Sequence, residues 1–401
     1  MKSAFWWERK DLSYNNNSLE FAGRNVQHLA EMFQTPSFFY SAKRLKKNLK
    51  RLSLVLSNTG LNHKIYYAMK ANRHVPLLTY MKTTGLCGVD ACSPEEVLLA
   101  LSCGFDASEI SYTATSVSNA DLDFLSRYPD LIVNCDSISQ IKRLGKKCPN
   151  RDIGIRINPA MGTGYGSVDV LRYSGEKTTK FGIYKEQFDD ALQAAKDYNL
   201  VVKRIHFHTG CGYLSSQLPV WEKILEACLW FIKRVDGIEV VNLGGGLGVP
   251  HTTSDEKLDL EKWSGVIQKV FEGKNISIEI EPGDYIVKDA GILLLEVNMV
   301  EKKQETVFAG VNGGFNLAVE PFFYSLPCEP VACVIHDPKK PFKPVTIAGN
   351  INEALDVWME NHPMPEIYEG DFLAMINAGG YAASMSSNHC MRGAVREFLL
   401  F

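Results

Sequence analysis

The sequence predicts an α/β fold, a closed (β/α)8 barrel of the TIM type followed by a C-terminal all-β domain. Short apolar runs recur along the first 285 residues, and each is followed by a helical pattern. Eight such units suffice to close a parallel barrel. Beyond residue 285 the strand-like stretches are separated by turns, with little helix. The 401 residues, 45% of them hydrophobic, can bury a core in each domain.

The strand candidates of the barrel are apolar runs of a length that suits buried parallel strands. The intervening helices carry their own signals: Ser93 is a predicted N-cap, Glu96 can close a capping box, and Gly104 ends that helix. The eight runs are Ile65–Met69, Gly88–Ala91, Ile110–Thr113, Leu131–Cys135, Ile153–Ile157, Arg204–Phe207, Val240–Leu243 and Ile276–Ile280.

The domain boundaries follow from where this rhythm begins and ends. The barrel is expected over residues 36–285, and the β domain over 286–401, where ILLLEVNMVE, TVFAGVN, PVACVIH, KPVTIAG and FLAMINAG read as strands. Residues 1–35 are too irregular to open a barrel, so we expect them to add a strand or helix to the β domain. The glycine-rich residues 159–180 are expected to form a mobile loop over the barrel mouth.

Composition excludes several classes of partner. The net charge of −3 and pI near 6.3 provide no basic field for nucleic acid. No signal-peptide core and no run of about 18 apolar residues is present, so no membrane association is expected and the location is expected to be cytoplasmic. The ten cysteines form no C-x-x-C pair, which is typical of a reducing compartment.

Chemistry in such a barrel lies at the C-terminal ends of its strands. Lys70 stands at one such end, in IYYAMKAN. In IHFHTGCG, His206 and His208 share one face of a strand because side chains repeat every two residues. His208 lies nearer the mouth, whereas His206 is the better candidate for a core histidine. A third metal ligand at suitable spacing is lacking, so no metal is expected.

Two further strand ends complete the constellation. Gly244, Gly245 and Gly246 follow a strand and can turn backbone N–H groups toward an anion, although a plain tight turn is the alternative. Glu281 ends the eighth strand. An amine, an imidazole, a phosphate cradle and a carboxylate together match pyridoxal 5′-phosphate. Lys70 would attach it, His208 would stack on its ring, and Glu281 would keep the ring nitrogen protonated, which strengthens the electron sink.

At this point the chain resembles a known family. YYAMKAN, DACSPEE, HFHTGCG, NLGGGLG, EPG and NAGGYAASMSSNHCMR, in this order over roughly residues 36 to 395, are similar to the alanine-racemase-fold (fold type III) decarboxylases of the diaminopimelate and ornithine type. The resemblance implies a pyridoxal-phosphate-dependent carboxy-lyase acting on a basic amino acid, and a homodimer with active sites at the interface. The cofactor-binding positions that it matches are Asp90, Ser93, Glu96, Arg156, Gly210, Cys211 and Tyr381, the last on the phosphate.

Two departures concern the cofactor and the proton donor. Asp284 stands where the family's EPGR has arginine, so Gly210, Cys211, the glycine triplet and Tyr381 must do more of the phosphate binding. Asn352 replaces a cysteine that protonates the product carbanion from the partner subunit, while Glu353 is retained. Asparagine cannot act as an acid. The candidates for another donor are Lys70, Glu353, His389 and Cys390.

A third departure concerns the substrate. Glu320 in EPFFY replaces the arginine of an RPALY-like stretch, so Glu320 and Asp356 would present negative charge to the substrate side chain, beside Tyr324. The expectation is therefore a biosynthetic decarboxylase of a basic or diamino acid, or a conjugate of one, similar to siderophore or secondary-metabolite enzymes. Asn352, Glu353 and Tyr324 are expected at the subunit interface, completing the partner's site.

Three alternatives remain open. The first is diaminopimelate decarboxylase of lysine biosynthesis. The second is an amino-acid racemase, although a racemase of the alanine type places arginine against the ring nitrogen, so Glu281 favours decarboxylation. The third is a non-catalytic paralogue, for which Asp284 and Asn352 speak, and against which the retained Lys70 and His208 speak.

Overall fold

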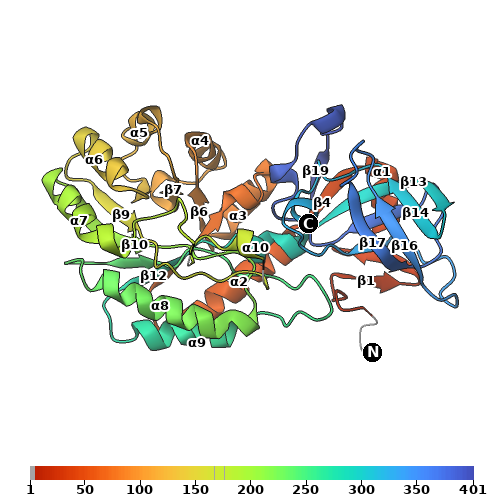
Figure 1. The fold of residues 1–401 in the computed structure, drawn as a ribbon, viewed down its shortest axis with the longest axis horizontal. Helices are drawn as coiled ribbons and strands as arrows, with labels where there is room; N and C mark the ends of the chain where they lie inside the picture. The colour runs from red at the N-terminus through yellow and green to blue at the C-terminus, as the bar shows by residue number, and fades with distance from the viewer. Residues whose placement is uncertain (1–4, 167, 176) are drawn as a thin grey trace. The chain divides into compact units, whose positions relative to one another are not determined.

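The computed structural model describes residues 5–166, 168–175 and 177–401 (Figure 1). The start of the N-terminal segment, Met1–Ala4, used above against a signal peptide, lies outside them. The chain divides into two compact units. The barrel unit comprises residues 48–249 and 256–285, and the sheet unit comprises residues 1–47, 250–255 and 286–401.

Eight parallel strands close the barrel in the order β10-β11-β12-β5-β6-β7-β8-β9. Each predicted run overlaps one of these strands, which confirms the barrel (Figure 1). Consecutive runs pair in parallel register, as in the pairing of Tyr66, Tyr67 and Ala68 with Gly88, Val89 and Asp90. The strands are β5 His63–Ala68, β6 Gly88–Ala91, β7 Ile110–Thr113, β8 Ile132–Cys135, β9 Asp152–Arg156, β10 Val201–His206, β11 Val240–Asn242 and β12 Ser277–Ile280.

Helices follow the strands and cover the outside of the barrel (Figure 1). The predicted start of α4 is present, because Ser93 accepts a hydrogen bond from the Glu96 backbone N–H and Glu96 accepts one from the Cys92 N–H. The largest buried side chains include Trp221 and Trp263. The helices are α2 Ala42–Ser57, α3 Val75–Thr84, α4 Pro94–Ser102, α5 Asn119–Leu125, α6 Ile138–Lys147, α7 Phe188–Asp197, α8 Leu218–Ile232, α9 Leu260–Phe271 and the short α10 Asp284–Val287.

The glycine-rich segment after β9, of which residues 167 and 176 lie outside the described residues, is hydrogen-bonded to the turn after β10, and its mobility stays a prediction. Backbone hydrogen bonds join Thr163 N–H to the Thr209 carbonyl and Tyr165 N–H to the Cys211 carbonyl, while Cys211 N–H donates to the Leu171 carbonyl. A Cβ at Gly210 would lie 1.6 Å from the Thr163 oxygen, so only glycine permits this approach. The segment is therefore fastened to the turn that follows β10.

The sheet unit contains a six-strand path in the order β15-β18-β13-β14-β16-β17, with β4 pairing to both β13 and β19. The predicted stretches correspond to β13, β14, β15, β16 and β18, whereas β17 and β19 escaped prediction. The elements are β1 Leu12–Asn15, β2 Ser18–Phe21, β3 Arg24–Asn25, α1 Val26–Phe33, β4 Ser37–Ser41, β13 Gly291–Lys303, β14 Thr306–Val311, α11 Glu320–Phe323, β15 Pro330–Ala332, β16 Lys343–Ala348, β17 Val357–Met364, β18 Phe372–Met375 and β19 Arg396–Leu400.

The N-terminal segment belongs to the sheet unit because of what it buries. Trp7, Leu12 and Phe21 pack in one apolar core with Ile292 and Leu294 of β13. The boundary differs from residue 36, since β4 is buried along its whole length between β13 and β19. Among the described residues, none of the helices is long and apolar enough to cross a membrane.

Candidate active site

The predicted residues of the barrel stand at the C-terminal ends of its strands. Lys70 follows β5 by two residues, in a 3-10 turn over Met69–Ala71. Asp90 is the penultimate residue of β6, and Glu281 directly follows β12. Asp90 and Glu281 are buried, whereas Lys70 is partly buried. The parallel direction of the strands thus brings an amine and two carboxylates to the same end of the barrel.

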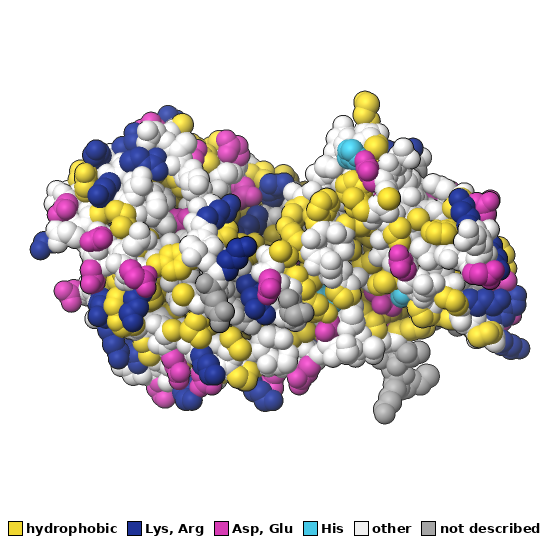
Figure 2. Space-filling model, in the orientation of Figure 1, with side chains coloured by type: hydrophobic (Ala, Val, Ile, Leu, Met, Phe, Trp, Pro, Cys, Tyr) yellow, Lys and Arg dark blue, Asp and Glu magenta, His cyan; other side chains and the backbone are white. Residues whose placement is uncertain are grey.

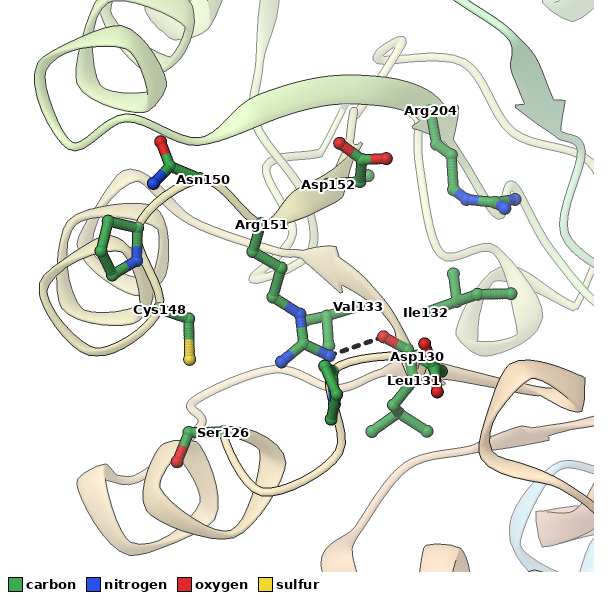
Figure 3. Close-up of a pocket in the computed structure, with 13 residues that line it drawn as sticks. Ser126, Asp130, Leu131, Ile132, Val133, Cys148, Asn150, Arg151, Asp152 and Arg204 are labelled. Carbon is green, nitrogen blue, oxygen red and sulfur yellow. Dashed lines mark hydrogen bonds between the residues drawn. The ribbon is translucent and has the colours of Figure 1, made fainter.

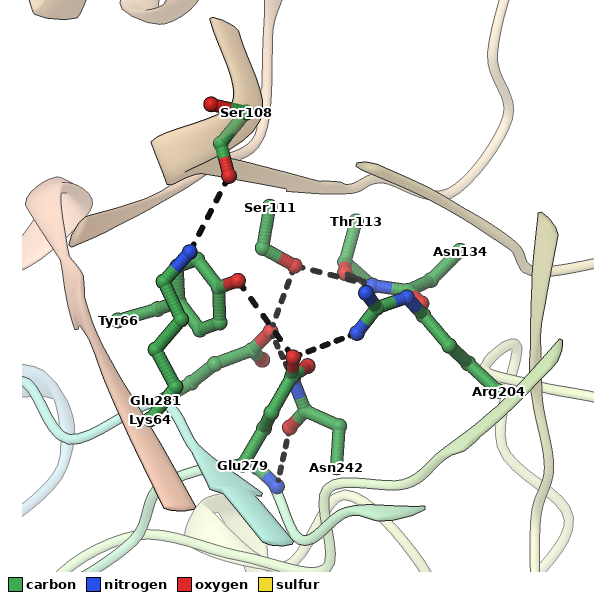
Figure 4. A network of polar contacts seen from close by, with 11 residues as sticks. Lys64, Tyr66, Ser108, Ser111, Thr113, Asn134, Arg204, Asn242, Glu279 and Glu281 are labelled. Atoms are coloured by element: carbon green, nitrogen blue, oxygen red, sulfur yellow. Dashed lines mark hydrogen bonds and ion pairs between the residues drawn. The ribbon is translucent and has the colours of Figure 1, made fainter. Parts of the chain in front are cut away.

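Glu281 is held by three donors from three other strands. Two of them, Ser111 and Asn242, are shown in Figure 4. The Nε2 of His206 lies 2.8 Å from Oε2 of Glu281. The other oxygen, Oε1, accepts a hydrogen bond from Ser111 Oγ at 3.0 Å and from Asn242 Nδ2 at 2.8 Å. Asn134 Nδ2 donates to Ser111 Oγ, so the hydroxyl proton of Ser111 is directed at Glu281. A carboxylate with about four acceptor positions keeps one for a further donor.

These contacts determine the charge of Glu281. Burial alone would raise the pKa of Glu281, but His206 and the hydrogen-bond donors outweigh it and lower this pKa to about 2. The carboxylate is therefore ionised at neutral pH. A donor that carries a proton toward Glu281 would meet a fixed negative charge at low dielectric.

The glycine turn 244–246 packs directly on the end of β12. Glu281 N–H donates to the Gly244 carbonyl at 2.7 Å. A Cβ at Gly245 would lie 2.2 Å from the Glu281 carbonyl oxygen, and Gly244 has φ +66°. Glycine is therefore required here for close approach as well as for backbone conformation. The N–H groups of Gly244 and Gly245 donate to Asn242 and His208, and the predicted phosphate-binding role of this turn stays a prediction.

His208 lies beyond the end of β10 in a polar and aromatic surrounding. Its Nδ1 accepts a hydrogen bond from Gly245 N–H at 3.3 Å, and its Nε2 lies 3.6 Å from Cys211 Sγ. The Tyr173 ring packs edge-on against it, with ring centroids 4.7 Å apart. Burial, followed by the positive charges of Lys70 and Arg156, lowers the pKa of His208, so the imidazole is neutral.

Lys70 and its neighbours form one electrostatic cluster. Nearby Cys92 and Asp90 raise the pKa of the Lys70 amine, although burial opposes them. Burial and the like charge of Glu281 raise the pKa of Asp90. Asp90 Oδ1 is buried and has no hydrogen-bond partner among the described residues. An unsatisfied buried oxygen in such a cluster suits a polar ligand.

Arg156 ends β9 and lies on the same side of the barrel. Its Nη1 is 3.4 Å from Asp136 Oδ1, and its guanidinium lies over the Phe181 ring, 4.7 Å from the centroid. Both Arg156 and Asp136 are buried. The Phe181 and Tyr173 rings are 5.1 Å apart, so the segment after β9 contacts both Arg156 and His208.

The sheet unit carries the remaining predicted residues, and two of them differ from expectation. Asp356 points inward: Oδ1 accepts the Phe315 N–H and Oδ2 the Ile351 N–H, each at 2.7 Å. Glu320 lies 2.7 Å from the buried Lys288 amine. The negative charge expected at the substrate is therefore engaged by the backbone in one case and by Lys288 in the other. Sequence spacing could not reveal either partner.

Other predicted residues of this unit lie at its surface. Asn352 and Glu353 are exposed in the loop between β16 and β17, and His389 Nε2 lies 3.5 Å from Glu353 Oε1. Tyr324 directly follows α11 and is half-buried. Tyr381 is half-buried, with φ +54°. Glu353 and His389 are thus neighbours, although 36 positions separate them in the sequence.

A cavity of about 570 Å³ lies at the opposite end of the barrel, beside the starts of β8 and β9 (Figure 3). Arg151 lines it, but its guanidinium donates to the carbonyls of Leu125, Tyr128 and Leu131. Arg204, also in its lining, is paired with Glu279. These arginines stabilise the barrel, and this cavity lies away from the strand ends that bear Lys70 and Glu281.

Sequence reasoning missed several residues of the site. His206 was treated as a core histidine, and it is buried, but its partner is Glu281. Ser111, Asn242 and Tyr173 were not singled out. Alternation within each strand could have indicated Ser111 and Asn242, because both face the barrel interior near the strand ends.

Two family models match this chain, one over most of the barrel unit and one over part of the sheet unit. Residues 42–288 match the model of the pyridoxal-dependent decarboxylase, pyridoxal binding domain, and residues 284–379 match that of the pyridoxal-dependent decarboxylase, C-terminal sheet domain. Diaminopimelate decarboxylase of Methanothermobacter thermautotrophicus is 31% identical over 97% of this chain and 92% of its own length. Diaminopimelate decarboxylase of Escherichia coli K12 is 26% identical over 95% of this chain and 92% of its own length.

Solved structures are similar in fold. The diaminopimelate decarboxylase of M. jannaschii in co-complex with L-lysine superposes with a TM-score of 0.87 at 24% identity, covering 98% of this chain and 93% of that one. The Paramecium bursaria Chlorella virus arginine decarboxylase superposes with a TM-score of 0.81 at 19% identity, covering 94% of this chain and 99% of that one. These relatives lend no support to the expected siderophore or secondary-metabolite subgroup.

Proposed function

The chain belongs to the pyridoxal-dependent decarboxylases, and we propose that within this family it decarboxylates diaminopimelate. The single observation that carries the substrate is the likeness to the Methanothermobacter diaminopimelate decarboxylase, 31% identical over nearly the whole of both chains. The enzyme is a pyridoxal-phosphate-dependent carboxy-lyase. The α-carboxylate of the amino acid leaves as carbon dioxide, and a proton takes its place.

The barrel residues fit this cofactor. A Cβ in the turn 244–246 would collide with neighbouring backbone, so glycine keeps this turn packed against the strand ends. Glu281 keeps one acceptor position for a donor of the cofactor. Asp90 Oδ1 offers an unsatisfied buried acceptor. The bound cofactor supplies the electron sink for the negative charge that the departing carboxylate leaves behind.

Each side chain then has a defined task. Lys70 would attach the cofactor through its amine, and the neutral His208 would pack against its ring. Gly210, Cys211, the turn 244–246 and Arg156 would hold the phosphate and ring. Glu281, which stays ionised despite its burial chiefly because of His206, would hold a proton on the ring nitrogen. The negative charge of Glu281 favours decarboxylation over racemisation, because a racemase of the alanine type places an arginine against the ring nitrogen.

The contacts of Glu320 and Asp356 in the sheet unit change the expected substrate. The expectation that diaminopimelate is disfavoured rested on free negative charge at Glu320 and Asp356. Lys288 neutralises Glu320, and Asp356 binds two backbone N–H groups. A second substrate carboxylate therefore meets less repulsion than the sequence indicated. The main expectation of another diamino acid gives way to diaminopimelate.

We further propose a homodimer in which Asn352, Glu353 and Tyr324 complete the partner's site. Exposed apolar side chains support an interface on the sheet unit: Phe323 is 59% exposed, Leu355 49% and Met391 88%. Figure 2 shows apolar side chains gathered on part of the surface of this unit. Exposed apolar area of this kind marks association surfaces.

The substrate is tested by comparing kcat/KM for diaminopimelate, lysine, ornithine and 2,3-diaminopropionate, with released carbon dioxide as the readout. We expect kcat/KM for diaminopimelate to exceed kcat/KM for each of the others by at least about 10²-fold, the range in which charge pairing discriminates between substrates. A preference for lysine, ornithine or diaminopropionate would overturn the substrate. Racemisation without carbon dioxide release would overturn the reaction.

The cofactor attachment is tested separately. Borohydride treatment of the yellow protein should abolish the visible band and add the cofactor mass to the peptide that contains Lys70. Lys70→Ala should show neither change. A label on another lysine would contradict the assignment of Lys70.

A further inference from the structure

We propose that Asn242 is a positioning residue that holds the two ends of the cofactor site together, the carboxylate of Glu281 and the glycine turn 244–246. This inference rests on the proposed function and deepens it. Asn242 is completely buried at the end of β11. Its Nδ2 donates to Glu281 Oε1 at 2.8 Å, and its Oδ1 accepts the Gly244 N–H at 2.9 Å (Figure 4).

The orientation of this amide is determined by chemistry. A carboxylate only accepts hydrogen bonds and a backbone N–H only donates, so the NH2 group must face Glu281 and the oxygen must face Gly244. The bond to Gly244 spans two residues and forms an Asx turn, which fixes the first step of the glycine segment. One rigid side chain thus contacts both groups at once.

The second N–H of Asn242 is directed at another carboxylate. Nδ2 of Asn242 lies 3.4 Å from Oε2 of Glu279, which is on β12 two residues before Glu281 and also faces the barrel interior. Arg204 Nη1 lies 2.5 Å from Glu279 Oε1 and compensates its charge. Because Arg204 satisfies Glu279, the shorter contact of Asn242 goes to Glu281. Tyr66 Oη also donates to Glu279 Oε1, at 3.5 Å.

The consequence concerns where one proton rests. Every donor to Glu281 makes this carboxylate a weaker base, so a proton shared with the ring nitrogen stays on the nitrogen. His206 and Ser111 contribute two donors, and Asn242 contributes the third. Without Asn242 the Glu281 carboxylate becomes a stronger base and competes more strongly for this proton, and the glycine turn loses its Asx contact as well.

The experiment uses holoenzyme reconstituted with pyridoxal phosphate carrying ¹⁵N in its ring. The ¹⁵N chemical shift reports whether the ring nitrogen is protonated, and titration of the apoenzyme gives the cofactor Kd. In Asn242→Ala we expect the signal to move toward the unprotonated range, and the Kd to rise by at least about 10-fold, the size of a lost buried hydrogen bond. Glu281→Gln should move the ¹⁵N signal with little change in Kd.

A conservative variant separates positioning from packing. Asn242→Asp keeps the oxygen that accepts Gly244 N–H, so its Kd should stay close to that of the wild type. Burial and the facing charges of Glu279 and Glu281, countered by Arg204 and His206, raise the pKa of the introduced carboxyl. Below that pKa it donates to Glu281 as asparagine does, and above it cannot. The ¹⁵N signal of this variant should therefore lose the protonated form as pH rises, at a pH where the wild type keeps it.

Tyr66→Phe is the matched control. Tyr66 is also buried inside the barrel, but its hydroxyl contacts Glu279 rather than Glu281. Removing this hydroxyl should leave the ring nitrogen protonated and the Kd unchanged. A wild-type protein that binds no cofactor would refute the proposed function. A wild type that binds it, together with unaltered ¹⁵N signals in both Asn242 variants, would refute this inference alone.

Discussion

The Nε2 of His206 and the Oε2 of Glu281 lie 2.8 Å apart, and both side chains are buried inside the barrel. His206 belongs to β10, and Glu281 follows β12, 75 positions later. The pair keeps this carboxylate ionised, as its proposed role beside the ring nitrogen of pyridoxal phosphate requires.

Glu281→Gln should retain the cofactor and lose turnover. The amide cannot hold a proton on the ring nitrogen, so the electron sink weakens while the attachment at Lys70 is unaffected. We expect kcat to fall by about 10²–10³-fold, the usual cost of removing one preorganised charge partner. Steady-state carbon dioxide release and the visible spectrum measure the two effects. Undiminished kcat in a cofactor-loaded variant would show that Glu281 is not this partner.

Glu281 should also make stability depend on acid pH. Its pKa is about 2 in the folded chain and near 4.3 when unfolded, so its contribution is complete above the unfolded value and disappears as pH falls toward the folded one. The difference in free energy of unfolding between wild type and Glu281→Gln should shrink by about 3 kcal/mol from pH 5 to pH 2. Glu305→Gln, at a 96% exposed side chain, serves as the control. A constant difference would contradict the lowered pKa.

Arg204 should stabilise the barrel by compensating Glu279. Arg204→Met leaves a buried carboxylate without its cation, which costs about 3–5 kcal/mol in free energy of unfolding. Lys203→Met is the matched control, because the adjacent Lys203 forms an exposed ion pair with Glu239, and its loss should change stability very little. Urea denaturation measures both. Adding Glu279→Gln to Arg204→Met should restore most of the loss, and failure to do so would point to packing rather than charge.

Mixing two inactive variants should test the proposed dimer. In a hybrid of Lys70→Ala and Glu353→Ala, one site contains an intact Lys70 and an intact Glu353 from the other subunit. Equal mixing should recover roughly a quarter of wild-type activity, because half of the dimers are hybrid and each has one complete site. Lys70→Ala mixed with Glu281→Gln should recover nothing, since both changes lie in the barrel. A fully active Glu353→Ala would contradict the shared site.

The sequence alone determined the barrel and the residues at its mouth. Eight apolar runs with helical segments between them lead to parallel strands, and parallel strands carry Lys70, Asp90, His208 and Glu281 to one end whatever the details of packing. Such properties depend on local period and chain direction, which can be read along the sequence. The strands β13, β14, β15, β16 and β18 were predicted in the same way, whereas β17 and β19 were not. The bulged, partly exposed pattern of β17 hides its period.

The tertiary structure alone decided which side chains meet. Lys288 neutralises Glu320 across 32 positions, Asp356 turns inward to two backbone N–H groups, and Asn242 joins Glu281 to the glycine turn. Lys288 and Glu320 lie on different elements, as do Asn242 and Glu281, so these contacts form only when the chain folds. A charge read in the sequence has a sign, but its effect depends on the groups that surround it after folding, because burial and hydrogen bonding determine its strength.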